Sequence, residues 1–171
     1  MRLSLVPHPD TPAAVAAITV DVVRPRPERL TLHYRVTGGA AVLRLPQAAS
    51  AERTDGLWHH TCFEVFVRGN HQTAYREFNF APSTAWAAYG FDGYREGMRN
   101  LETSPPQIHA GPEGDDFLLT ASIELAPPLP ARIAVSAVIE ELSGRKSYWA
   151  LAHPPGRPDF HHAIGFDHKL T

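Results

Sequence analysis

The chain has 171 residues, of which 43% are hydrophobic and 20% charged, a composition that suits one globular domain with a buried core. Its formal net charge is −2 with the ten histidines counted as neutral, so charge predicts neither nucleic acid nor an anionic membrane as a partner. Cys62 is the single cysteine, which excludes an intramolecular disulfide.

The first ten residues do not resemble a signal peptide. Their apolar run is short, and Pro7, His8 and Asp10 interrupt it. No segment approaches the length of a membrane-spanning helix. We therefore expect a cytoplasmic protein.

The first half of the chain predicts short strands separated by turns. Apolar alternation predicts strands over residues 15–23 and 30–36. Gly38 and Gly39 predict a turn, after which residues 41–45 would return as the partner strand of a hairpin. Residues 47–57 are small and polar and predict a loop.

The second half continues the same pattern, and 12 glycines and 16 prolines punctuate the whole chain. Further strands are predicted over 62–67, 75–80, 85–91, 117–125, 133–139 and 146–153, with a short one near Ile108. The tail from residue 154 is predicted to be irregular. With no internal repeat or linker, we expect one all-β domain over residues 1–171, an antiparallel two-sheet β-sandwich of roughly nine or ten strands.

Two of these predicted strands carry large or charged side chains on both faces. Glu64 alternates with Phe63 and Val65, whereas Glu77 and Asn79 share one face of the strand over residues 75–80. Burying a carboxylate without a partner costs several kcal/mol. Either this face is open and binds a ligand, or neighbouring arginines, Arg76 and Arg95, neutralise it internally.

Three segments resemble a known group: the strand from Thr61 to Phe66, the strand and corner from Tyr75 to Ser83, and the run from Trp86 to Met98. Together with Phe160 to Phe166, they resemble the DOMON-like β-sandwich superfamily, near the family 9 carbohydrate-binding modules. Bacterial DOMON-like proteins, some with relatives fused to UDP-N-acetylmuramate dehydrogenase, are similar in these segments. The resemblance implies a two-sheet sandwich that binds sugar or heme and has no chemistry of its own.

The favoured interpretation is a non-catalytic module that binds carbohydrate or another small ligand. Trp58 precedes a strand and would stack on a sugar ring, whereas carboxylate, amide and guanidinium groups would hold its hydroxyls. The candidate ligand contacts are Trp58, Glu64, Glu77, Asn79, Trp86 and Arg95. Any of the tryptophans could instead fill the core. The paired carboxylates also permit a glycosidase, which we do not favour, because nothing in the sequence sets their separation.

Two alternatives stay open. Met98 with His161 or His162 could hold the iron of a b-type heme. The open face could instead dock a partner protein, with no small-molecule ligand. We predict no other metal site, because adjacent histidines on a strand point to opposite faces. The sequence does not specify an oligomeric state.

Overall fold

The computed structural model describes residues 1–47, 50–125 and 130–170. Within these ranges the chain is built from antiparallel strands and two short 3-10 turns, and it contains no helix long and apolar enough to cross a membrane. The strands are β1 (Arg2–Pro7), β2 (Ala17–Arg26), β3 (Arg29–Thr37), β4 (Cys62–Gly69), β5 (Tyr75–Phe80), β6 (Trp86–Phe91), β7 (Arg99–Asn100), β8 (Gln107–Glu113), β9 (Asp116–Glu124), β10 (Ala131–Glu140), β11 (Lys146–Ala150) and β12 (His168–Leu170). The 3-10 turns are η1 (Leu57–His59) and η2 (Ala163–Gly165).

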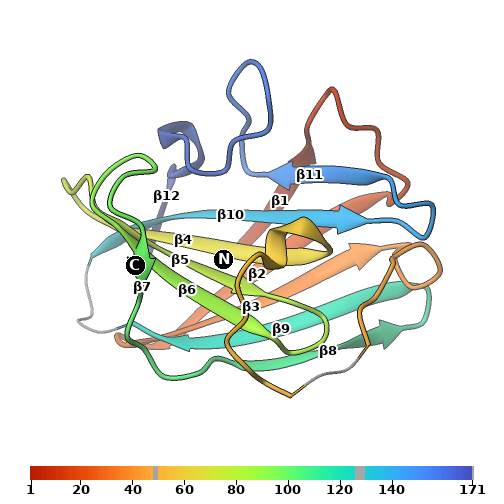
Figure 1. Cartoon of the computed structure of the whole chain (residues 1–171), viewed down its shortest axis with the longest axis horizontal. Helices are drawn as coiled ribbons and strands as arrows, with labels where there is room; N and C mark the ends of the chain where they lie inside the picture. The colour runs from red at the N-terminus through yellow and green to blue at the C-terminus, as the bar shows by residue number, and fades with distance from the viewer. Residues whose placement is uncertain (48–49, 126–129, 171) are drawn as a thin grey trace.

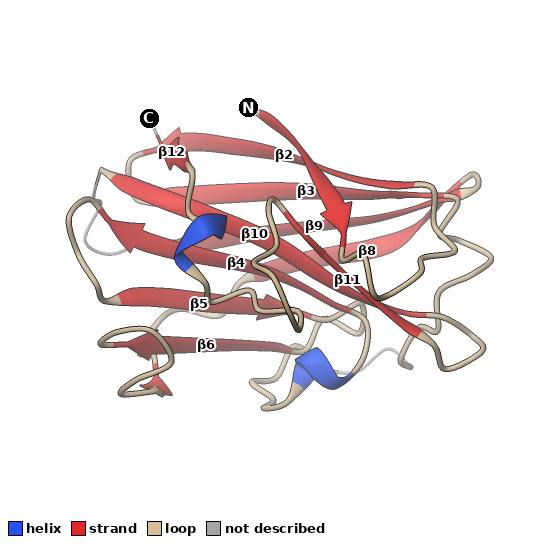
Figure 2. Cartoon of the chain, turned by 90° about the horizontal axis from the view of Figure 1, so that it is seen from above, coloured by secondary structure: helices blue, strands red, loops and turns tan. Residues whose placement is uncertain are grey.

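The strands form one continuous curled sheet (Figures 1 and 2) in the order β7-β6-β5-β4-β10-β11-β1-β2-β3-β9-β8, with β12 paired to β10. The prediction of an all-β antiparallel fold is confirmed. β1 joins the two halves of the sheet, because Arg2–Leu5 pair with β2 whereas Val6 and Pro7 pair with β11. The described strands therefore form one hydrogen-bonded path, and the predicted division into two sheets stays a prediction.

The core lies between the two halves of the curled sheet. On β3, Leu30, Leu32 and Tyr34 alternate with partly exposed residues, as expected when a strand has one buried face. Phe63 of β4 meets them from the opposite half, with its ring centroid 5.0 Å from that of Tyr34 and 6.4 Å from that of Phe117. We call this side of β4 and β5 the inner face.

The other side of β4, β5, β6 and β10, which we call the outer face, is also covered. A second, smaller hydrophobic cluster forms there from Phe66, Tyr75, Ala87, Tyr89, Phe91, Ala134 and Phe166. Leu57 and Trp58 of η1 and Phe160 of the C-terminal segment pack against it. Because both faces are covered, these strands are buried at almost every position.

The predicted hairpin partner over residues 41–45 is wrong. Val42 and Leu43 both donate backbone hydrogen bonds to Gly39 O, so the chain coils into a turn and only Leu43 bridges Glu141. β3 pairs with β2 and β9 instead. The twelve strands of the described residues exceed the nine or ten expected, because β1, β7 and β12 were not predicted. Residues 48–49 of the predicted loop lie outside the described residues.

Candidate functional site: a pocket on the outer face

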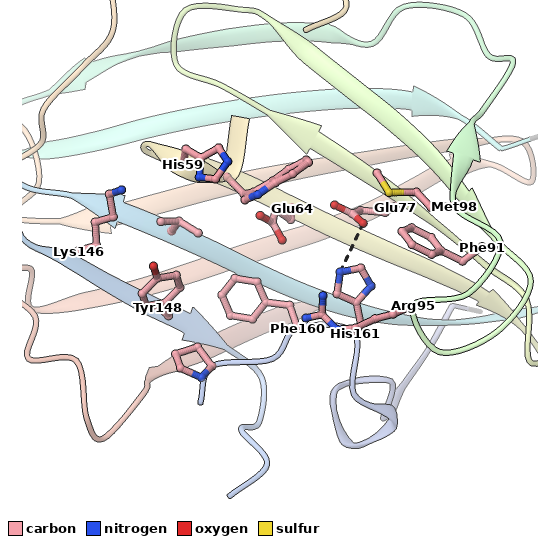
Figure 3. A pocket seen from close by; sticks show the side chains of 13 residues that line it. His59, Glu64, Glu77, Phe91, Arg95, Met98, Lys146, Tyr148, Phe160 and His161 are labelled. Carbon is pink, nitrogen blue, oxygen red and sulfur yellow. Dashed lines mark ion pairs between the residues drawn. The ribbon is translucent and has the colours of Figure 1, made fainter. Parts of the chain in front are cut away.

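A pocket of about 490 Å³ opens on the outer face. Its lining residues come from η1, from β4, β5, β6, β10 and β11, from the loop after β6, and from the C-terminal segment. Figure 3 shows Phe160 and His161 of that segment facing Glu64 and Glu77 across the pocket. The aromatic lining residues are Trp58, Phe91, Tyr148 and Phe160.

The floor carries two buried carboxyl groups on adjacent strands. Glu64 of β4 lies opposite Asn79 of β5 and opposite Ser136 of β10, so the three side chains form one polar row across the sheet. Ser136 Oγ donates to Glu64 Oε2 at 3.2 Å, and Asn79 Nδ2 donates to Glu77 Oε1 at 2.7 Å. Only 3% of Glu64 and 5% of Glu77 is exposed, so both carboxyl groups lose most of their hydration.

This burial changes how the two acids titrate. Burial raises the pKa of Glu64 well above its ordinary value, the nearby Glu77 charge raises it further, and the Ser136 bond and Arg95 oppose both effects. Burial also raises the pKa of Glu77 to about 7, against the lowering effects of Asn79 and Arg95. The two carboxyl groups therefore resist being charged together.

His161 is the residue of the C-terminal segment that faces the floor. Its Nδ1 lies 2.8 Å from the Tyr75 hydroxyl, and its Nε2 lies 3.8 Å from Glu77 Oε2. Burial and the charge of Arg95 lower the pKa of His161 to about 4, although Asp159 acts in the opposite direction. The ring is therefore neutral near pH 7 and brings no positive charge to the carboxyl groups.

Asp159 connects the loop after β6 to the C-terminal segment, an arrangement we call the Asp159 latch. Arg95 Nη2 donates to Asp159 Oδ1 at 2.8 Å, and the Tyr94 hydroxyl donates to Oδ2. The His161 backbone N–H donates to the same carboxylate at 3.1 Å. Arg95 adopts a left-handed φ of 57°, which is unfavourable for a side chain of this size, so the surrounding contacts must hold the turn in place.

Trp58 reaches the pocket because η1 turns the chain back over the sheet. Gly56 caps η1 with φ of 74°, a conformation that glycine adopts without a Cβ clash. The Tyr89 hydroxyl donates to Asp55 Oδ1 at 2.6 Å and fixes the approach to η1. The half-buried Trp58 ring meets the edge of Tyr89, with centroids 6.0 Å apart, and leaves part of its surface to the pocket.

The structure brings together four of the predicted ligand contacts, namely Trp58, Glu64, Glu77 and Arg95. Asn79 is fully buried and acts behind the floor, where it holds Glu77. Trp86 instead lies in the core on the inner face, with the Arg53 guanidinium 4.4 Å from its ring centroid. Its position gives no support to the predicted ligand contact, because the alternation along β6 turns it away from the pocket.

Of the residues considered for heme, Met98 and His161 line the pocket, whereas His162 is exposed and caps η2 through a bond from the Ile164 N–H to its Nδ1. Across the described residues, no cluster of three or more histidine, cysteine or acidic side chains could hold a metal ion. Of the two arginines proposed to neutralise the carboxyl groups, Arg95 pairs with Asp159, and Arg76 is not among the lining residues.

Sequence reasoning missed Lys146 and Tyr148 of β11 and Phe160 of the C-terminal segment. Alternation along β11 could have indicated the first two, because Lys146 and Tyr148 lie on the face opposite to the buried Ser147 and Trp149. The rings of Tyr148 and Phe160 lie 6.2 Å apart and form one wall of the pocket.

Comparison with known proteins gives a fold and no family. No family model matches the chain, and no curated protein does. Among solved structures, one similar protein is from Bacteroides uniformis ATCC 8492 and is described as a candidate carbohydrate-binding protein. It aligns with a TM-score of 0.72 and 16% identity, over 97% of this chain and 84% of that one.

A family 9 carbohydrate-binding module from Caldicellulosiruptor kristjanssonii is also similar. In its complex with cellotriose it aligns with a TM-score of 0.54 and 11% identity, over 85% of this chain and 70% of that one. Its complex with glucose gives the same score and identity, over 71% of that chain. The fold of the chain is therefore like that of family 9 carbohydrate-binding modules.

Proposed function

We propose that the protein is a non-catalytic carbohydrate-binding module whose ligand occupies the pocket on the outer face. The fold likeness to modules solved with glucose and cellotriose supports this proposal. In the same proposal, the curled sheet is a DOMON-like sandwich whose two layers share β1.

The observation that carries the proposal is the combination of ring surface and unfilled acceptors in one pocket. Glu64 and Glu77 line the hollow, and among the described residues neither Glu64 Oε1 nor Glu77 Oε2 accepts a hydrogen bond. Trp58 and Phe160 supply apolar surface beside them. Sugars offer both complements, because their hydroxyls donate hydrogen bonds and their C–H faces pack on aromatic rings.

Hydrolysis is not part of this proposal. A glycosidase places its two carboxyl groups on opposite sides of the scissile bond. Glu64 and Glu77 come from neighbouring positions on one sheet face and approach a ligand from the same side. We therefore expect no release of reducing sugar from any substrate that binds.

Heme b fits this pocket poorly. Met98 and His161 both line it, but Tyr75 holds His161 Nδ1, and Nε2 faces Glu77. The two buried carboxyl groups would also lie against an apolar macrocycle, at a cost in desolvation. Titration with hemin should give no Soret band of a ligated heme. A Soret band that disappears in Met98→Ala would replace the sugar proposal with the heme one.

Isothermal titration against a panel of mono- and oligosaccharides tests the sugar proposal. We expect binding that weakens about tenfold or more in Trp58→Ala, because one stacking contact is worth roughly 1–2 kcal/mol. Leu142→Ala is the matched control, since Leu142 is 63% exposed and is not among the lining residues. If no sugar gives heat, and the purified protein instead captures a protein partner through this face, the interaction alternative replaces the proposal.

A further inference from the structure

The two floor carboxyl groups have no close cationic partner among the described residues. Arg95 lies within the lining, but its guanidinium is engaged by Asp159 at 2.8 Å. His161 Nε2 stands 3.8 Å from Glu77, beyond hydrogen-bond reach, and the ring is neutral at pH 7. Arg95 lowers the pKa of both acids without contacting them, so the floor holds buried carboxyl groups that lack the direct ion pair that buried carboxylates usually have.

Lys146 is not a cationic partner of Glu64 or Glu77. It lies opposite Glu140 on β10, whereas Glu64 lies opposite Ser136 of the same strand. Four residues separate Ser136 from Glu140, which is about 13 Å along an extended strand. Lys146 therefore lines the far end of the pocket, and Figure 3 shows it at the opposite end of the lining from Glu77.

The strand register places both acids on the same part of the outer face. Glu77 lies diagonally from Glu64, and its carboxyl group accepts from Asn79, the residue directly opposite Glu64. Glu77 is thus held toward the Glu64 row, and both side chains line the same hollow. Two converging acceptors in a buried setting suit a compact cation with several N–H donors better than a neutral hydroxyl.

A bare metal ion suits the floor less well. Hard cations such as Ca²⁺ take six or more oxygen ligands, and zinc takes three or four side chains. The described residues offer no cluster of three such side chains. An ammonium group needs only a few acceptors, and the Trp58 and Phe160 rings leave room beside it for a sugar ring.

We propose that the pocket binds an amino sugar, with the free ammonium group of the ligand between Glu64 and Glu77. This inference rests on the proposed function and narrows its ligand class. The ammonium forms charge-assisted hydrogen bonds to Glu64 Oε1 and Glu77 Oε2, the two acceptors without a partner in the described structure. The sugar ring then lies against Trp58.

Titration with three matched ligands tests the inference: glucosamine, glucose and N-acetylglucosamine, each also as its disaccharide. The amine is charged in the first, absent from the second and neutralised in the third. We expect the glucosamine series to bind about tenfold or more tightly than the others near neutral pH, because charge-assisted hydrogen bonds are roughly twice as strong as neutral ones. In Glu64→Gln/Glu77→Gln the preference should disappear, whereas the exposed Glu102→Gln should retain it.

The preference should also depend on pH in a defined direction. The groups near the two acids include Ser136, Asn79, Tyr75, Tyr89, Arg95 and His161, with Cys62 buried beside them. Protons compete with the ammonium for the carboxyl groups, so affinity should fall as pH drops below the Glu77 pKa of about 7. Binding should release protons, which titration in two buffers of different ionisation enthalpy measures.

The outcomes separate the two proposals. If glucose and N-acetylglucosamine bind as tightly as glucosamine, the amino-sugar inference is wrong and the carbohydrate-binding function stands. If no sugar in the panel binds, both proposals are wrong. A glucosamine preference that persists in the double variant would place the ammonium elsewhere and overturn this assignment.

Discussion

The inner and outer faces of β4 and β5 take alternate residues of the same two strands, yet their side chains differ in chemistry. On the inner face, Phe63 and Val65 are fully buried and meet only apolar neighbours of the core. On the outer face, Glu64 and Glu77 are almost as deeply buried but carry carboxyl groups into a hollow. Burial alone therefore does not distinguish structure from function in this sheet.

The hydrogen-bond partners distinguish the two faces. A buried ring needs only contact, and Phe63 obtains it from Tyr34 and Phe117. A buried carboxyl group needs donors, and Glu64 and Glu77 each obtain a single side-chain donor within the described residues. The inner face is complete without a ligand, whereas under our proposal a ligand supplies the donors that the outer face lacks.

The largest effect is expected on the inner face. Phe63→Ala should lower the free energy of unfolding by about 3–5 kcal/mol, because the ring is fully buried and its removal leaves a cavity. Trp58→Ala, at the pocket, should cost at most about 1 kcal/mol, since the ring is half-buried in a short turn. Urea denaturation of both variants measures the difference. Equal losses would mean that the pocket wall is part of the core.

The next effect is a gain in stability from removing an outer-face acid. The folded-state pKa of Glu77 is raised from 4.5 to about 7, so the folded protein binds a proton more tightly than the unfolded chain. Stability therefore falls as pH rises from 4.5 through 7. Glu77→Gln keeps the acceptor for Asn79 and removes this penalty. The variant should be more stable than the parent above about pH 7, by on the order of 3 kcal/mol, with little difference near pH 4.

The difference between variant and parent is the quantity to measure, by urea denaturation across this pH range. The parent curve alone also contains His161, whose lowered pKa makes stability rise with pH over part of the same range. The exposed Glu102→Gln is the control and should give a curve parallel to that of the parent. A Glu77→Gln variant that is less stable than the parent at alkaline pH would show that the carboxylate is satisfied internally.

Most of the strands could be predicted because alternation is a local signal. β5 was predicted with its observed bounds, and β4, β6, β9 and β10 were predicted within three residues at each end. β12 was missed because it forms only by pairing Leu170 with Ala131, far apart in the sequence. The 41–45 strand was predicted because apolar residues follow a glycine turn, but tertiary contacts direct this segment into a coil at Gly39.

The residues of the pocket could be predicted only in part, because tertiary contacts bring many of them together. Glu64 and Glu77 stood out because a carboxyl group in an apolar strand is costly, and this holds without any tertiary information. Trp58 and Trp86 looked alike in the sequence, and only the fold sends one to the pocket and the other to the core. Phe160 reaches the site through the path of the C-terminal segment, which no local pattern encodes.

A smaller effect is expected at the Asp159 latch, which holds the C-terminal segment over the outer face. Asp159→Asn should lower the free energy of unfolding by about 1 kcal/mol, because the Arg95 side chain is 52% exposed and the ion pair is screened. The clearer readout is hydrogen exchange, which should speed up at the His161 N–H that Asp159 now accepts from. Asp167→Asn is the control, since its pair with Arg132 is 3.8 Å long and its side chain is 85% exposed. If the His161 N–H exchanges faster in Asp167→Asn and not in Asp159→Asn, the Asp159 latch does not hold the C-terminal segment in place.

The smallest effect separates two adjacent histidines. His162 is exposed, and its contacts are the cap of η2 and an edge contact with the exposed Tyr94 ring, with centroids 6.4 Å apart, so His162→Ala should change stability by less than about 0.5 kcal/mol. Sugar affinity should stay within about twofold, because that residue lies outside the pocket lining. His161→Ala should weaken binding, since its ring packs 5.1 Å from that of Phe91 and faces Glu77. If His162→Ala loses as much sugar affinity as His161→Ala, the ligand extends past the Asp159 latch. The outer face then binds a longer saccharide than the pocket encloses.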